Sequence, residues 1–118
     1  MPYLLLIVED AESRRSRPKA QGQQAYRRMA DFAKGLRSRG LLLANDSLRT
    51  EAVRIQARNG KRLVVDGPFA ESKEMVGGFF LIDCATRDEA IAIAGECPAT
   101  EWAMVEVREI GPCWEGTD

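Results

Sequence analysis

The sequence has 118 residues and is 45% hydrophobic, which is enough for one domain with one core. Its 17 basic and 18 acidic residues leave a formal net charge of −1, which excludes a global positive field that would recruit nucleic acid or an anionic membrane. The absence of histidine excludes imidazole acid–base chemistry, histidine metal ligands and nucleophiles activated by histidine.

The N-terminus and the cysteines point to an intracellular setting. The run "MPYLLLIVED" has no basic region, and its apolar part stops at Glu9, too early for a signal peptide or a membrane span. Cys84, Cys97 and Cys113 form no CxxC pair, which argues against a disulfide framework and a zinc site. We therefore expect a cytoplasmic protein with no membrane contact, no direct nucleic acid binding, no metal and no cofactor.

The chain begins with a predicted strand at residues 3–8, "YLLLIV", a short apolar run of the kind that is buried on both faces. Residues 10–22 are polar, contain Pro18 and Gly22, and are predicted to form a mobile loop. Its basic residues are expected to be solvated, with phosphate contact as a second interpretation: Arg14, Arg15, Arg17 and Lys19.

The next two elements are a helix and a strand. Apolar residues recur every three or four positions from about residue 23 to 39, which predicts an amphipathic helix whose inner face includes Tyr26 and Met29. Gly40 supplies the left-handed residue that ends a helix. A second strand is predicted at residues 41–44, "LLLA".

A β-hairpin is the strongest local prediction. Apolar and polar residues alternate over residues 53–58, the chain turns at Asn59–Gly60, and it returns over residues 63–65. A further strand is predicted at 77–83, "GGFFLID", where the two glycines permit a bulge or a close backbone approach.

The C-terminal part predicts a helix, a strand and a tail. Thr86 and Glu89 form a capping box, and Ala90, Ile91 and Ala94 are expected to face inward. The helix should end at Pro98, the last strand follows at 102–110, and residues 111–118 are expected to be a flexible tail.

This order of elements predicts a single domain over residues 1–118 with an α+β, ferredoxin-like (split βαβ) fold. The antiparallel sheet would carry two helices on one face and an inserted hairpin. Because residues 3–8 and 79–82 are apolar on both faces, the other face of the sheet would stay open. We expect a second copy to cover it in a homodimer.

The loop "DGPFAESKE" at residues 66–74 carries two interpretations. In the structural one, Asp66 bonds nearby amides, Gly67 and Pro68 fix the turn, and Phe69 plugs the core. In the functional one, the rigid loop presents charged groups to a pocket at the sheet edge, where a desolvated carboxylate works as a general base.

The functional interpretation names the candidate residues. The catalytic candidates are Asp66, Glu71 and Lys73. The ligand-binding candidates, for a small molecule, are Asp66, Gly67, Pro68, Phe69, Lys73 and Glu74. Glu9 and Asp10 would join them if the first strand lies beside this segment.

The same loop carries a resemblance. Together with "YLLLIVEDAE" near the start, "GGFFLID", and "CPATEWAMVEVREI" near the end, it resembles the DGPF branch of the YCII-related family. The resemblance implies a ferredoxin-like domain that forms a dimeric α/β barrel, in small bacterial proteins mostly of unassigned function. Some relatives are fused to sigma factors of RNA polymerase or encoded beside them.

Part of the wider family is thought to use a histidine and an aspartate in a cleft beside the sheet. Aligned on the first helix, the place of that histidine falls near Met29, so this chain lacks the pair. Three functions stay open: a dimeric small-molecule-binding or accessory module, a lyase or isomerase with a carboxylate base, and a transcription regulator that acts through protein contact.

Overall fold

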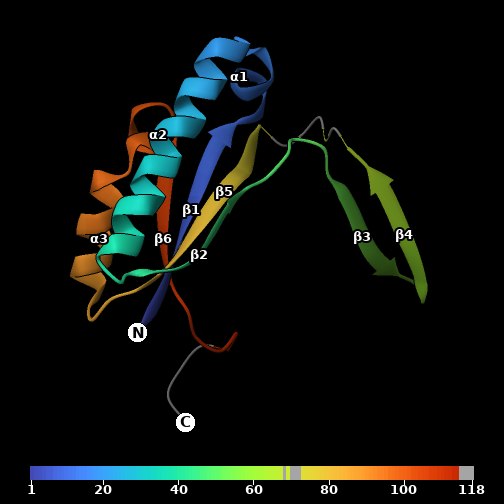
Figure 1. Cartoon of the computed structure of the whole chain (residues 1–118). Coiled ribbons are helices and arrows are strands. Elements are labelled where there is room, and N and C mark those ends of the chain that lie inside the picture. Colours follow the sequence, from blue (N-terminus) through green and yellow to red (C-terminus); the bar gives the residue numbers. More distant parts are fainter. Residues whose placement is uncertain (68, 70–72, 115–118) are drawn as a thin grey trace.

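The computed structural model describes residues 1–67, 69 and 73–114, and these form an α+β protein around a four-stranded antiparallel sheet (Figure 1). Across the sheet the strands are β2 (Leu42–Ser47), β5 (Glu74–Asp83), β1 (Pro2–Asp10) and β6 (Met104–Glu109). The inserted hairpin, β3 (Val53–Arg58) and β4 (Lys61–Asp66), is a separate two-stranded sheet. The predicted α+β class with an antiparallel sheet is therefore confirmed.

The mobile loop predicted at residues 10–22 is wrong. The segment contains α1 (Ala11–Ser16), and α2 (Lys19–Ser38) begins directly after Pro18. The Asp10 side chain accepts a hydrogen bond from the Ser13 amide at 2.9 Å and so caps α1, while Pro18 precedes a helix, where its missing N–H costs nothing. The two residues that suggested a loop are compatible with helices at their positions.

Helix α2 covers one face of the sheet through the apolar stripe that its sequence predicts (Figure 1). Ala33 and Leu36 are buried, and the Phe32 ring meets Phe80 of β5 edge to face at 5.2 Å. Gly40 has the positive φ of 71° that the predicted helix stop requires. None of the helices within the described residues is both long and apolar enough to cross a membrane.

Helix α3 (Arg87–Glu96) begins at the predicted cap, where Thr86 Oγ1 accepts from the Glu89 amide at 3.1 Å. One inward residue was predicted wrongly: Ile91 is 43% exposed, and Ile93 is buried in its place beside Ala90. After a short 3-10 turn, Pro98–Glu101, the chain enters β6. Of the predicted tail, residues 111–114 are exposed and outside any helix or strand, and 115–118 lie outside the described residues.

The two faces of the central sheet differ in their cover. Tyr3, Leu5 and Ile7 of β1 are buried under the helices with Phe80 and Ile82 of β5. Their sequence neighbours point to the other face, which carries no helix and where the apolar side chains are only partly buried: Leu4, Leu6, Val8, Phe79 and Leu81. Figure 1 shows both long helices on the opposite side of the sheet.

The hairpin projects away from the central sheet (Figure 1). Its predicted turn is confirmed, because Asn59 and Gly60 have φ values of 51° and 76°, as a two-residue hairpin turn requires. All six residues of each strand are exposed. The Cα radius of gyration, 16.4 Å, exceeds the roughly 13.5 Å of a compact chain of this length.

Candidate ligand-binding site

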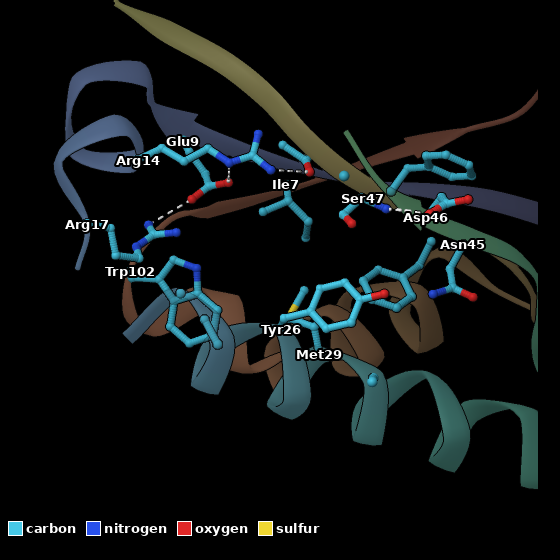
Figure 2. Close-up of a pocket in the computed structure, with 17 residues that line it drawn as sticks. Ile7, Glu9, Arg14, Arg17, Tyr26, Met29, Asn45, Asp46, Ser47 and Trp102 are labelled. Carbon is cyan, nitrogen blue, oxygen red and sulfur yellow. Dashed lines mark hydrogen bonds and ion pairs between the residues drawn. The ribbon is translucent and has the colours of Figure 1, made fainter. Parts of the chain in front are cut away.

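A cavity of about 190 Å³ lies between helix α2 and the end of the central sheet that carries α1 (Figure 2). Its apolar walls come from four elements: Ile7 of β1, Tyr26 and Met29 of α2, Phe80 of β5, and Trp102 after the 3-10 turn. Figure 2 shows Glu9, Arg14 and Arg17 gathered at one end and Asn45, Asp46 and Ser47 of β2 at the other. The cavity is therefore apolar along its length and polar at both ends.

Glu9 is the buried charge of this cavity and is only 6% exposed. The alternation of β1 puts it on the same face as Leu5 and Ile7. Arg17 Nη2 donates to Glu9 Oε1 at 2.9 Å, and Arg14 Nε lies 3.6 Å from Glu9 Oε2. Both guanidinium groups are themselves largely shielded from solvent, so the carboxylate is held between two partly buried cations.

Gly77 makes room for this carboxylate. The pairing of β1 with β5 shifts between Ile7 and Val8, so that Gly77 is an extra residue in β5, a β-bulge. A Cβ atom at Gly77 would collide with Glu9 Oε2, and the Gly77 carbonyl accepts from Arg14 Nη2 at 3.4 Å. The predicted bulge and close approach at the glycine pair are confirmed.

The wall formed by Trp102 is fixed from outside the cavity. Arg28 of α2 lies over the Trp102 ring, 5.5 Å from its centroid, and its guanidinium forms two hydrogen bonds with Glu101. The hydrogen bond from Arg28 holds the pKa of the Glu101 carboxyl below its usual value. This ion pair joins the 3-10 turn to α2 and so holds Trp102 beside the cavity.

Sequence reasoning missed the cluster of Glu9, Arg14 and Arg17. The prediction that Arg14 and Arg17 are solvated is wrong, whereas Arg15 and Lys19 are exposed as expected. A signal was present, because the strand alternation that buries Ile7 carries on to Glu9 and so demands a cation for it. However, the contact of either arginine with Glu9 could not be predicted without knowing that α1 forms.

The tyrosines divide between the core and the cavity mouth. Both were expected in the core, and Tyr3 is buried there, but Tyr26 is 64% exposed at the cavity and its core assignment is wrong. Trp102 also lines the cavity.

The described residues of the DGPF loop contribute nothing to the lining of the cavity. Asp66, the last residue of β4, is exposed and pairs with Val53. The Gly67 amide donates to the Ala52 carbonyl at 2.8 Å, and the half-buried Phe69 ring lies 3.7 Å from the Arg54 guanidinium, outside the predicted place in the core. Two of the candidates, Pro68 and Glu71, lie outside the described residues.

The other end of the loop returns to the central sheet. Lys73 is exposed, and its carbonyl accepts from the Ala11 amide at 2.8 Å. Glu74 is exposed and pairs with Asp10, so the predicted approach to the first strand occurs there, while Glu9 turns to the cavity. A second surface hollow is lined by Gly67, Phe69 and Glu74, with neither Asp66 nor Lys73 among its described residues. Catalysis by this loop stays a prediction.

The cysteines agree with a structural role. Cys84 and Cys97 are buried, and Cys113 is exposed. Burial raises the pKa of both buried thiols. Over the described ranges, the structure brings together no group of three or more acidic or thiol side chains that could hold a metal ion.

Comparison with known proteins adds two findings. Residues 1–113 match the YCII-related domain family. A stretch of 45 residues is 51% identical to an uncharacterized protein of Rhizobium meliloti (strain 1021), and it covers 38% of this chain and 36% of that protein. The chain thus aligns with about a third of the length of this relative.

Proposed function

The chain belongs to the YCII-related domain family, and on that premise we propose that it is a small-molecule-binding module that works as a homodimer. One observation carries the proposal: Glu9 is buried between Arg14 and Arg17 at the end of an apolar cavity. A buried ion cluster contributes little to stability compared with apolar packing, whereas convergent charges in an apolar pocket are typical of binding sites.

The cavity favours a small ligand with a polar end. Its volume of about 190 Å³ is that of a small cavity. At the arginine end, two cations face one carboxylate, so the cluster keeps a net positive charge for an anionic or hydrogen-bond-accepting group. Tyr26, Met29 and Trp102 offer apolar surface to the rest of the ligand.

Binding is favoured over proton-transfer chemistry in this cavity. Met29, which the alignment of the first helix sets near the histidine of some relatives, lines the same cavity as Glu9. The thioether of Met29 neither donates nor accepts a proton near neutral pH. The carboxylate has no neighbour among the described lining residues that could replace an imidazole, because its two close partners are arginines.

The fold and the apolar sheet face support the assembly. The strand order β2-β5-β1-β6, with helices between β1 and β2 and between β5 and β6, is consistent with the ferredoxin-like fold. The partly exposed Leu4, Leu6 and Phe79 on the face without helices would be covered by the same face of a second copy, as in a dimeric α/β barrel.

A second candidate is an enzyme of lyase or isomerase type that uses the DGPF loop. The surface hollow lined by Gly67, Phe69 and Glu74 favours it, because a ligand there would lie beside the segment that carries Asp66. In this mechanism Asp66 or Glu71 takes a proton from the substrate as general base, and Lys73 holds an anionic group of the same substrate.

Native mass spectrometry of the protein purified from its own host tests the cavity. We expect a reproducible small adduct that is lost in Arg17→Ala and kept in Arg15→Ala, which removes an exposed arginine of α1. An adduct that survives Arg17→Ala in a folded protein would contradict the cavity site.

The variant Asp66→Asn separates the two candidates. Its side chain is exposed, so we expect a change in the free energy of unfolding within about 0.5 kcal/mol. If the cavity is the site, the adduct stays; loss of the adduct without loss of stability would move the site to the loop.

A further inference from the structure

The β3–β4 hairpin, residues 53–66 and here called the arm, has no buried residue in either of its strands. All twelve of its strand positions are exposed, and Figure 1 shows it standing clear of the sheet and the helices. A two-stranded hairpin is marginally stable by itself in water, because neither face is buried. Packing of the arm against another surface would therefore stabilise it.

One face of the arm is richer in aliphatic side chains than the other and is here called its apolar face. The pairing of Ile55 with Val64 and of Ala57 with Arg62 puts these side chains on the same face, together with Val53. Ile55 is 65% exposed and Val64 is 64% exposed. The other face, here called basic, has Arg54 over the Phe69 ring and Arg58 beside Lys61, together with the exposed Leu63 and Val65. The apolar face is the one that gains from contact with a protein surface.

The charge of the arm complements the rest of the same chain. The arm contains four basic residues, Arg54, Arg58, Lys61 and Arg62, and one acidic residue, Asp66. Its net charge is +3, and because the whole chain has a formal net charge of −1, the remainder carries a net charge of −4. A basic arm and an acidic body attract each other between two copies of this chain.

The accessible surface area of the chain is also larger than that expected for a compact monomer. The accessible surface is 8653 Å², against roughly 6,400 Å² for a compact monomer of 13.1 kDa. The excess of about 2,300 Å² is comparable to what each chain buries in an obligate homodimer. A second copy thus accounts for both the area and the charge.

We propose that the arm of each copy packs, apolar face inward, on the body of the other copy. The inference rests on the proposed homodimer and goes beyond it, since the sheet face alone leaves the arm uncovered. In a two-fold dimer the contact is made twice, so each arm residue acts at two places. A nucleic acid would instead meet the basic face and leave Val53, Ile55 and Val64 exposed.

The test compares two charge insertions one residue apart. Ile55→Glu places a carboxylate on the apolar face, and Gln56→Glu places the same group on the opposite face of the same strand. Both side chains are exposed, so neither change should unfold the single copy, and circular dichroism of each variant would check this. We expect Ile55→Glu to raise the dimer dissociation constant about tenfold or more and Gln56→Glu to leave it nearly unchanged, measured by light scattering over a dilution series.

A third variant, Leu6→Glu on the sheet face, separates the contribution of the arm contact from that of the sheet-face contact to the dimer. Weakening by both Ile55→Glu and Leu6→Glu supports the arm contact. If Leu6→Glu dissociates the dimer and Ile55→Glu does not, the arm proposal is overturned and the dimer stands. Equal weakening by Gln56→Glu also overturns it, because the effect would be one of charge alone. A monomeric wild type would overturn both the arm contact and the proposed homodimer. Ligand binding in the cavity would still be tested separately, by native mass spectrometry of Arg17→Ala and Arg15→Ala.

Discussion

At the scale of single residues, the cavity depends on how closely the backbone of β5 approaches Glu9. The carboxylate takes the space that a side chain at position 77 would fill. Its charge is balanced by Arg14 and Arg17, and Arg14 is in turn bonded to the Gly77 carbonyl. Gly77 thus leaves space for the Glu9 carboxylate, and its carbonyl accepts a hydrogen bond from Arg14.

Gly77→Ala should displace the Glu9 carboxylate. The added methyl group must move either Glu9 or the strand, which we expect to cost about 1–3 kcal/mol of the free energy of unfolding and to abolish the adduct. Gly35→Ala is the control, because a Cβ there meets nothing within 4 Å on helix α2, and it should be stabilising by up to about 1 kcal/mol. Denaturant unfolding measures both; an unchanged stability in Gly77→Ala would refute the described packing.

The two buried thiols should react more slowly than the exposed thiol of Cys113. Burial raises the pKa of Cys84 and Cys97, so the folded state holds these protons at a pH where the unfolded chain has lost them. Their contribution to stability is therefore complete below the unfolded pKa of about 8.5 and falls as the pH rises above it. Intact-mass analysis after alkylation at pH 8 should show rapid labelling at the exposed Cys113 alone; rapid labelling of all three would contradict the burial.

At the scale of secondary-structure elements, α1 is the short helix that brings the arginines to the cavity. It depends on one capping bond, from the Ser13 amide to Asp10 Oδ1. It is also tied to the loop before β5, through the Ala11 amide and the Lys73 carbonyl. An element of six residues has little intrinsic stability, so these few contacts decide whether it forms.

Removing the cap should affect binding as well as folding. Asp10→Ala is expected to lower the free energy of unfolding by about 1 kcal/mol and to weaken the adduct, because α1 positions Arg14. Thr86→Ala removes the matching cap of α3, far along the chain from the cavity, at a similar cost to stability and no cost to binding. Equal adduct levels in both variants would show that α1 does not shape the site.

These elements also show how far the sequence predicts the structure. Helix α3 and the hairpin were predictable because their signals are local: a capping box at Thr86 and a left-handed pair at Asn59–Gly60. Helix α1 was not, because Pro18 and Gly22 are typical of loops and its start is held in part by a tertiary bond, from the Ala11 amide to the Lys73 carbonyl. The cavity was missed for the same reason, since Arg17 meets Glu9 through that helix.

At the scale of the whole molecule, two apolar surfaces are left without cover: the sheet face and the arm. In both cases the pattern of the strand places aliphatic side chains away from the helices. Single exposed aliphatic residues need no explanation, but two continuous surfaces on one small chain do.

The protein should be a dimer at micromolar concentration. We expect light scattering to give about twice the chain mass of 13.1 kDa, because two apolar surfaces favour association. High salt should weaken the contact between basic arm and acidic body, and with it the dimer, by only a modest factor, since screening acts on charges and not on apolar burial. Complete dissociation in salt would show that charge, and not apolar packing, holds the copies together.

The bulge in β5 has a consequence for how this site could be gained or lost. Because Val8 pairs with Val76 and Ile7 with Gly78, deletion of Gly77 would leave a regular ladder with every neighbour on its present face. The sheet would keep its register, while Arg14 and the Leu48 amide would lose the carbonyl that both contact. The proposed binding site thus depends on one inserted residue in a strand that could form without it.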